Sequence, residues 1–420
     1  MKLIIREAKI IDSQSKYHNT VVDIQISGNT IEKMGTAISA PDNYEEITIP
    51  NLHISQGWFD SSVCFGEPGF EERETITQGL QVAAQSGFTS IALQPNTLPV
   101  VDNLAQVTFI KQKSSNLAVS CYPIGALTKN TEGNELAELY DMKNAGAIGF
   151  GDYAKNINNA NLLKIALQYV QDFDGLVIAF SQEESIKGKG FVNEGITATR
   201  LGMKGIPLLS EEIIVARNLF LLEYTGGKLH IPTITSPKSA QLIKEAKAKG
   251  LQVSCSVAAH HLYLNDEVLS SFDTRYKVNP PLQSESTRKE LLSFVLDGTI
   301  DCITSDHYPM DIEHKKMEFD WAKNGTIGLE SAFGALHQLL PITVVIEKLT
   351  AGKRIFAIPN YPIEEGQPAC LSFFNPDINW EFTTNNILST SKNSAFLYQP
   401  MKGKALGIYN KGQLIIATNG

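Results

Sequence analysis

Short apolar segments alternate with longer stretches of helical spacing from about residue 54 to about residue 350. This alternation is typical of buried parallel strands joined by helices. Eight such units over about 300 residues predict an α/β protein built on a (β/α)8 TIM-type barrel. A doubly wound open sheet is the structural alternative, but no glycine-rich phosphate loop follows the first strand. The expected strands are 57–60, 90–94, 119–124, 147–150, 176–180, 228–231, 251–256 and 301–305.

Both ends of the chain have the pattern of β structure. Leu3–Ile5, Val21–Ile26 and Ile31–Met34 are apolar or alternating runs separated by turn residues. The turn sequence Tyr409-Asn410-Lys411-Gly412 predicts a hairpin near the other end. We predict a small composite β-sandwich of residues 1–53 and 362–420 beside a barrel of residues 54–361. Its C-terminal strands are expected at 370–374, 380–382, 404–409 and 413–416.

The composition argues against several classes of function. A net charge of −9 disfavours nucleic acid as a partner, because phosphate binding requires clustered Lys and Arg. The apolar runs are interrupted well short of the ~18 residues that a membrane span needs. The five cysteines form no CxxC pair, and four lie in apolar, strand-like surroundings typical of reduced core cysteines. We therefore expect a cytoplasmic protein that binds neither nucleic acid nor a membrane.

Sequence blocks spread over about 350 residues occur in the order found in one enzyme family. Residues 60–69 read Asp-Ser-Ser-Val-Cys-Phe-Gly-Glu-Pro-Gly, where that family has Asp-x-His-x-His-x-Arg-x-Pro-Gly. Each block is weak alone, but together they are specific. The chain resembles the dihydroorotase branch of the amidohydrolase barrels. Further matching blocks are Pro95-Asn96-Thr97, His260-His261-Leu262, residues 277–282 and Ser305-Asp306-His307.

The resemblance implies a zinc site whose histidine ligands are missing here. In the family, zinc polarises the cyclic amide and lowers the pKa of bound water toward ~7. None of the four ligand histidines remains, and two carboxylates do. Such a donor set holds zinc weakly, so we expect no cofactor, and Asp306 is either vestigial or a proton shuttle. The corresponding positions are Ser62 and Cys64 on the first strand, Asp152 after the fourth, Phe180 and Thr233 on the fifth and sixth, and Asp306 on the eighth.

The substrate side of the implied site is also depleted. The arginine that would bind a substrate carboxylate is replaced by Gly66, and a second arginine by Gln283. A carboxylate therefore lacks its bidentate partner. A substrate-contacting histidine of the family is Met310 here. Three positions still match the family and are our predicted substrate-binding residues: Asn96, Asn279 and His307.

His260 and His261 could be taken for a new metal pair. Adjacent residues on a strand point to opposite faces of the sheet, so the two rings could not readily bind one ion. The pair also belongs to the blocks that carry the family resemblance. We therefore predict a structural role for both histidines.

Three functions remain open. The first, which the ligand losses favour, is a non-catalytic dihydroorotase homologue of pyrimidine biosynthesis with a structural or assembly role. The resemblance implies aspartate carbamoyltransferase as its partner, and we expect a homo-oligomer. The second is an active dihydroorotase or related cyclic amidase, using either zinc on Cys64, Asp152 and Asp306 or metal-free chemistry with Asp306 and His307. The third is a small-molecule sensor anchored by Asn96 and Asn279.

Overall fold

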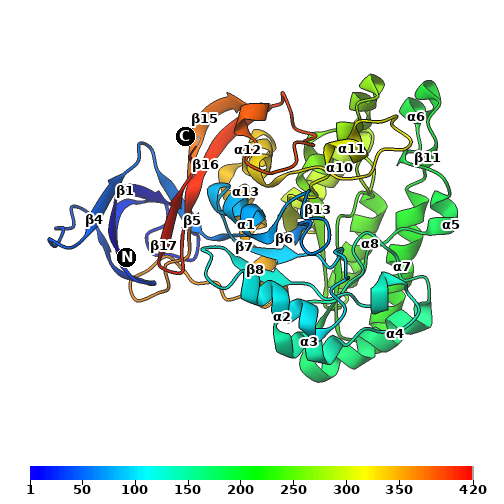
Figure 1. Ribbon diagram of the computed structural model, residues 1–420, viewed down its shortest axis with the longest axis horizontal. Helices are drawn as coiled ribbons and strands as arrows, with labels where there is room; N and C mark the ends of the chain where they lie inside the picture. The colour runs from blue at the N-terminus through cyan, green and yellow to red at the C-terminus, as the bar shows by residue number, and fades with distance from the viewer. Residues whose placement is uncertain (419–420) are drawn as a thin grey trace.

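The computed structural model describes residues 1–418 and contains a closed barrel next to a large sheet (Figure 1). Three parallel strands on one side and four on the other are joined by residue Phe150, which bridges Gly125 and Val177. A parallel bridge from Val63 to His307 closes the ring. The predicted (β/α)8 barrel is therefore confirmed. Its strands are β6 (Trp58–Val63), β7 (Phe88–Leu93), β8 (Ser120–Pro123), β9 (Leu176–Ile178), β12 (Lys228–Ile231), β13 (Val253–Ala258) and β14 (Cys302–Thr304).

The expected fourth barrel strand is wrong as a continuous element. Within residues 147–150 only Phe150 forms a ladder bridge. Gly149 and Gly151 flank it, and a Cβ at Gly151 would lie 2.5 Å from the carbonyl oxygen of Ile178. The chain passes too close to β9 at this point for side chains, which explains why the apolar run is so short.

Helices surround the barrel and begin at recognisable caps. Thr75 accepts a hydrogen bond from the backbone N–H of Gln78 and starts α1, and Ser236 caps α8 in the same way. The helices are α1 (Ile76–Gln85), α2 (Leu104–Lys113), α3 (Leu139–Ala145), α4 (Ala160–Tyr169), α5 (Glu184–Lys187), α6 (Ile196–Leu201), α7 (Leu209–Thr225), α8 (Pro237–Ala248), α9 (Ala259–Tyr263), α10 (Glu285–Leu296), α11 (Ile312–Lys315), α12 (Leu329–Leu339), α13 (Ile342–Thr350) and α14 (Gly352–Ile355). Short 3-10 turns are η1 (Lys129–Thr131), η2 (Val170–Phe173), η3 (Asp266–Ser271), η4 (Thr274–Tyr276) and η5 (Thr384–Asn386).

Strands from both ends of the chain share one eight-stranded sheet, in the order β17-β16-β15-β5-β1-β2-β3 with β4 also paired to β1. β4 and β5 run parallel to β1, whereas the other pairs are antiparallel. The sheet has its own apolar core, which includes Ile24, Ile54 and Phe373. Its strands are β1 (Lys2–Ile10), β2 (Val21–Ser27), β3 (Thr30–Gly35), β4 (Glu45–Thr48), β5 (His53–Gln56), β15 (Leu371–Glu381), β16 (Pro400–Asn410) and β17 (Gln413–Ile416); β10 (Val192–Asn193) and β11 (Gly205–Ile206) pair separately.

The C-terminal strands differ from prediction in one respect. The two expected runs at 370–374 and 380–382 are one bulged strand, β15. The predicted hairpin is present between β16 and β17, and Lys411 and Gly412 at its turn both have positive φ, 50° and 72°, as a two-residue hairpin turn requires.

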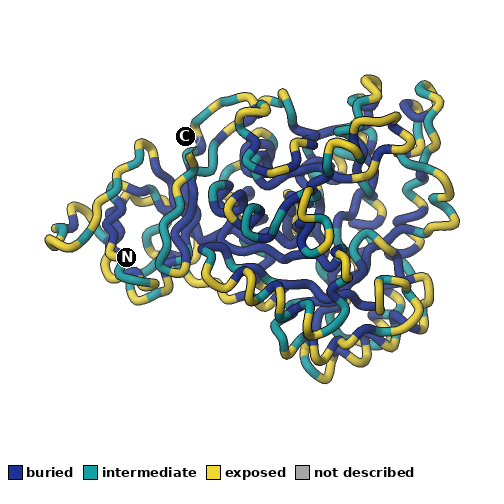
Figure 2. Tube along the Cα trace, viewed as in Figure 1, coloured by how far each residue is buried: buried dark blue, intermediate teal, exposed yellow. Residues whose placement is uncertain are grey.

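Burial follows the two cores (Figure 2). The strands of the barrel and of the sheet are mostly buried, whereas the outer faces of the helices and the loop tips are exposed. Within residues 1–418, no helix is long and apolar enough to cross a membrane.

Candidate functional site

A small inner cavity lies at the carboxyl ends of the barrel strands, where barrel proteins build their sites. It has about 20 Å³ of space for water centres, which is room for one or two waters. Five of the six predicted metal positions line it, and they come from five different positions around the barrel. These are Ser62, Asp152, Phe180, Thr233 and Asp306.

Asp306 is held by hydroxyl groups. Ser62 Oγ donates to its Oδ1 at 2.9 Å, and the Tyr153 hydroxyl donates to the same oxygen at 3.3 Å. Burial raises the pKa of Asp306 to about 6, helped by the nearby Asp60, while the hydrogen bonds from Ser62 and Tyr153 act in the other direction. Asp306 is therefore a carboxyl group that titrates near neutrality beside a water-sized cavity.

Asp60 holds the strand ends that carry Ser62 and Asp306. It accepts hydrogen bonds from the backbone N–H of Ser62 at 3.0 Å and of Ser305 at 2.8 Å, and from the Thr304 hydroxyl. The carboxylate therefore ties β6 to β14 and fixes Ser62 and Asp306 relative to each other. Sequence reasoning noted Asp60 only as part of a motif; its place at the start of that motif was the available signal.

Asp152 and Cys64 are poor metal ligands in this structure. Both Asp152 oxygens are used by the loop after β8, through the N–H groups of Leu127 and Thr128 and the Thr128 hydroxyl. Cys64 is fully buried, and burial raises its pKa well above the usual value, so the neutral thiol dominates.

The donor set does not fit the zinc pair that the resemblance implies. Phe180 and Thr233 line the cavity where imidazole ligands would be needed. Over residues 1–418, no three His, Cys, Asp or Glu side chains are grouped so that they could hold a metal ion. Asp306 is the one predicted metal position whose carboxylate faces the cavity and accepts only hydroxyl hydrogen bonds.

A larger outer cavity of about 320 Å³ adjoins the inner one. Tyr153 and Asp306 line both. Two predicted substrate-binding residues, Asn96 and Asn279, line the outer cavity, and Asn96 Oδ1 has no hydrogen-bond partner among the described residues. The volume of the outer cavity is at the lower end of the range for pockets that bind small molecules. Sequence reasoning missed Tyr153, because nothing in the periodicity marks a loop tyrosine as a cavity wall.

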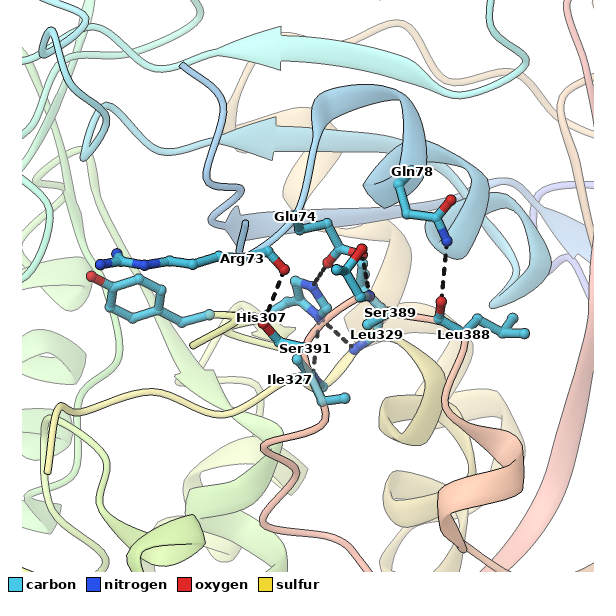
Figure 3. Close-up of polar contacts among 12 residues, drawn as sticks. Arg73, Glu74, Gln78, His307, Ile327, Leu329, Leu388, Ser389 and Ser391 are labelled. Carbon is cyan, nitrogen blue, oxygen red and sulfur yellow. Dashed lines mark hydrogen bonds and ion pairs between the residues drawn. The ribbon is translucent and has the colours of Figure 1, made fainter. Parts of the chain in front are cut away.

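His307, a predicted substrate-binding residue, is engaged by the protein itself in this structure. His307 is fully buried, and its Nε2 lies 2.9 Å from Glu74 Oε2 (Figure 3). Its Nδ1 accepts the backbone N–H groups of Gly328 at 3.2 Å and Leu329 at 3.4 Å. A nitrogen that accepts carries no proton, so Nε2–H donates to Glu74. Both ring nitrogens are thus occupied, and His307 lines neither cavity.

Glu74 and its neighbours Arg73 and Gln78 also fasten the segment between β15 and β16 to the barrel. Glu74 Oε1 accepts the N–H of Thr390 at 3.1 Å, the Ser391 hydroxyl donates to the carbonyl of Arg73, and Gln78 donates to the carbonyl of Leu388 (Figure 3). Glu74 and His307 therefore form a structural joint.

The missing arginine cannot simply be restored at residue 66. A Cβ at Gly66 would lie 1.7 Å from the carbonyl oxygen of Phe70. The loop after β6 has closed over the space that a side chain would need. The other arginine replacement, Gln283, is buried and donates to the carbonyl of Pro281 at 2.9 Å. Met310 lines the outer cavity.

His260 and His261 are not on a strand. They lie in the short helix α9 directly after β13, with ring centroids 4.2 Å apart. The argument from opposite faces of a strand is therefore wrong. Both rings are buried, and His261 Nε2 lies 2.8 Å from the carbonyl oxygen of Pro280. Neither histidine lines the inner or the outer cavity.

Comparison with known proteins identifies the relatives of this chain. Residues 52–239 match the model of the family described as dihydro-orotase-like. A dihydroorotase from Geotalea daltonii is 35% identical over 99% of each chain, and one from Pelotomaculum thermopropionicum is 38% identical over 96% of each. Among solved structures, an L-hydantoinase from Arthrobacter aurescens has a TM-score of 0.87 at 20% identity, covering 100% of this chain and 96% of its own.

Proposed function

The chain belongs to the dihydroorotase-like family, and we propose that it is a non-catalytic member that acts in pyrimidine biosynthesis in the cytoplasm. The relatives' names support the place in metabolism. The proposal concerns what this chain has kept of the family's chemistry.

One observation carries the proposal: the inner cavity has the family's position but not a donor set for zinc. Phe180 and Thr233 stand where the resemblance places ligands, and the two remaining carboxylates are hydrogen-bonded by the protein itself. Loss of one supporting group commonly weakens metal binding ~10–100-fold, and here four ligands are replaced. Gly66 adds a loss on the substrate side, because its loop leaves no space for an arginine.

The alternative is an active dihydroorotase, which the names of the relatives favour. Asp306 is the residue on which it would depend. With a pKa of about 6 and a place between a water-sized cavity and a ligand-sized one, its carboxylate could accept a proton at neutral pH. This route needs a way to polarise the amide carbonyl without the family's zinc pair.

The deciding experiment measures dihydroorotate hydrolysis, and the reverse cyclisation, by the purified chain with excess zinc. The Asp306→Asn variant is the matched control, because it keeps the shape of the cavity and removes the base. We expect no turnover by either protein above the uncatalysed rate. Turnover by the wild type that disappears in the variant would overturn the proposal, whereas equal turnover by both proteins comes from a contaminating hydrolase.

For the assembly role, we propose aspartate carbamoyltransferase as the partner and a homo-oligomer as the state of this chain. Both follow from the family resemblance. Co-expression of the two proteins from the same organism, followed by size exclusion with light scattering, tests both. A stable complex of defined stoichiometry is expected. A monomer that does not bind the carbamoyltransferase would contradict the assembly role and leave the catalytic question to the hydrolysis assay.

A further inference from the structure

A third cavity, of about 290 Å³, lies at the opposite end of the barrel from the candidate site. Thr89, Ser90 and Ser120, which line it, lie at the first residues of β7 and β8, whereas the candidate site lies at the strands' other ends. Asn410 and Lys411 of the β16–β17 hairpin line it from the sheet. The cavity therefore lies between the barrel and the eight-stranded sheet.

The cavity contains a buried lysine without an acidic partner. Lys353 is 2% exposed, and its Nζ lies 3.1 Å from Asn360 Oδ1 and 4.0 Å from the sulfur of Cys370. Among residues 1–418, no Asp or Glu lines the cavity. Burial lowers the pKa of Lys353, and the neighbouring Cys370 acts to raise it. Burying an ammonium group costs free energy unless a negative charge is paired with it. A bound anion would supply that charge at this site.

A second lysine adds to the positive charge of this cavity. Lys411 lies at the exposed rim, where its Nζ donates to the carbonyl of Leu117 at 3.3 Å. Neighbouring Lys111 lowers its pKa further, in addition to burial. The part of the lining that the structure describes thus holds two lysines and no carboxylate, in a chain whose net charge is −9. Hydroxyl and amide groups of Ser90, Ser120 and Asn29 add uncharged hydrogen-bonding capacity.

We propose that this cavity binds a small oxyanion, the phosphate or carboxylate group of a small molecule, through Lys353 and Lys411. The ligand would supply the charge that the lining lacks and would bridge the barrel to the sheet. This inference is independent of whether the candidate site at the carboxyl end is catalytic. Phosphate and carboxylate share the chemistry that the two ammonium groups recognise, and the test below separates them.

Cys370 gives a built-in reporter for the cavity. It is half-buried and lines the cavity, whereas the other four cysteines are 2% exposed or less. Iodoacetamide should therefore modify Cys370 first. An anion held on Lys353, 4.0 Å from the sulfur, should block the reagent.

The experiment measures the rate of Cys370 alkylation by mass spectrometry in phosphate, in malonate and in chloride at equal ionic strength. With phosphate or malonate at ten times its Kd, we expect alkylation to be about tenfold slower than in chloride, because protection follows occupancy. Lys353→Met should lose the protection, and Lys316→Met, an exposed lysine outside the cavity, should retain it. Protection by phosphate alone or by malonate alone identifies the class of ligand.

Equal alkylation rates in all three salts, together with no heat of binding in phosphate or malonate titration calorimetry, would overturn the proposal. So would full protection in Lys353→Met. If that variant does not fold, Lys411→Met takes its place, because a substitution at the exposed rim is tolerated more readily. It should shift the protecting phosphate concentration upward, and an unchanged concentration would count against the site.

Discussion

The two ends of the barrel differ in how many hydrogen-bond partners the protein provides for their buried charged side chains. At the carboxyl end, Asp60, Asp152 and Asp306 are all buried, and each accepts hydrogen bonds from backbone or hydroxyl groups of the protein. At the amino end, Lys353 is buried beside one amide and one thiol. The carboxyl end has the water-sized inner cavity and the outer cavity of about 320 Å³, and the amino end has a cavity of about 290 Å³.

The end of the barrel at which the family resemblance places a site therefore differs from the end at which a buried charge has no counter-charge within residues 1–418. The family resemblance directs attention to the carboxyl end, where the protein's own groups now satisfy the charges and Phe180 occupies a ligand position. The cavity at the end that the resemblance does not mark is lined by two lysines and, within residues 1–418, by no carboxylate. If the comparison is right, removing charges at the two ends must have different consequences for stability.

The largest effect is expected for His307→Leu at the carboxyl end. The substitution leaves the Glu74 carboxylate buried without its partner and removes the acceptor of two N–H groups. Breaking one side of a buried pair typically costs about 3–5 kcal/mol. Urea unfolding should therefore show a loss of that size in the free energy of unfolding.

His314→Leu is the matched control. His314 pairs with Asp311 at 2.6 Å, but its side chain is 39% exposed, and exposed pairs contribute about 0–1 kcal/mol. A loss below about 1 kcal/mol in both variants would show that the Glu74–His307 joint does not hold the structure together.

A smaller, pH-dependent effect is expected for Asp306→Asn. Burial raises the pKa of Asp306 to about 6, above an unfolded value of about 3.9. Between these values the folded chain binds more protons than the unfolded chain, so this group's contribution to the free energy of unfolding falls as pH rises from about 4 to about 6. The variant lacks this term. Its stability relative to wild type should therefore increase by about 3 kcal/mol across that window.

The measurement is urea unfolding of both proteins from pH 4 to pH 7. Other groups titrate in the same range, but they cancel in the difference between the two proteins. Asp60, Cys64, Tyr153 and His307 act on Asp306 and are unchanged in the variant. A difference that stays constant with pH would mean that Asp306 is solvated, and the carboxyl end would then be more open than the inner cavity implies.

The sequence predicted the barrel because its buried strands are apolar runs separated by helices, and seven of the eight runs form strands. It failed at residues 147–150, where pairing depends on the close approach of Gly149 and Gly151 to β9 and not on hydrophobicity. It also failed at His260 and His261, because the chain turns into α9 directly after β13. The prediction treated residues 260 and 261 as part of a strand, whereas they lie in a helix, so their side chains need not point to opposite faces.

The candidate site was predictable in position and not in detail. Strand ends converge in a closed barrel, so residues far apart in sequence line one cavity, although their roles stay predictions. Contacts made through loops left no signal. Glu74 and His307 are 233 residues apart, and Tyr153 is an ordinary loop tyrosine in the sequence. Lys353 lies beside Arg354 in the sequence, and its burial was visible only in the structure.

The smallest effect is expected for Lys353→Met at the amino end. The ammonium group has no carboxylate partner, so its removal leaves no opposite charge unpaired, and methionine fills a similar volume. Replacing an uncompensated buried ion by an apolar side chain is often neutral or stabilising. In chloride, the free energy of unfolding should therefore change by less than about 1 kcal/mol. A loss near that of His307→Leu would show that Lys353 has a counter-charge within the fold, and the two ends of the barrel would then be alike. In phosphate, the wild type should gain stability while the variant does not, because only a ligand bound to the folded state shifts the equilibrium.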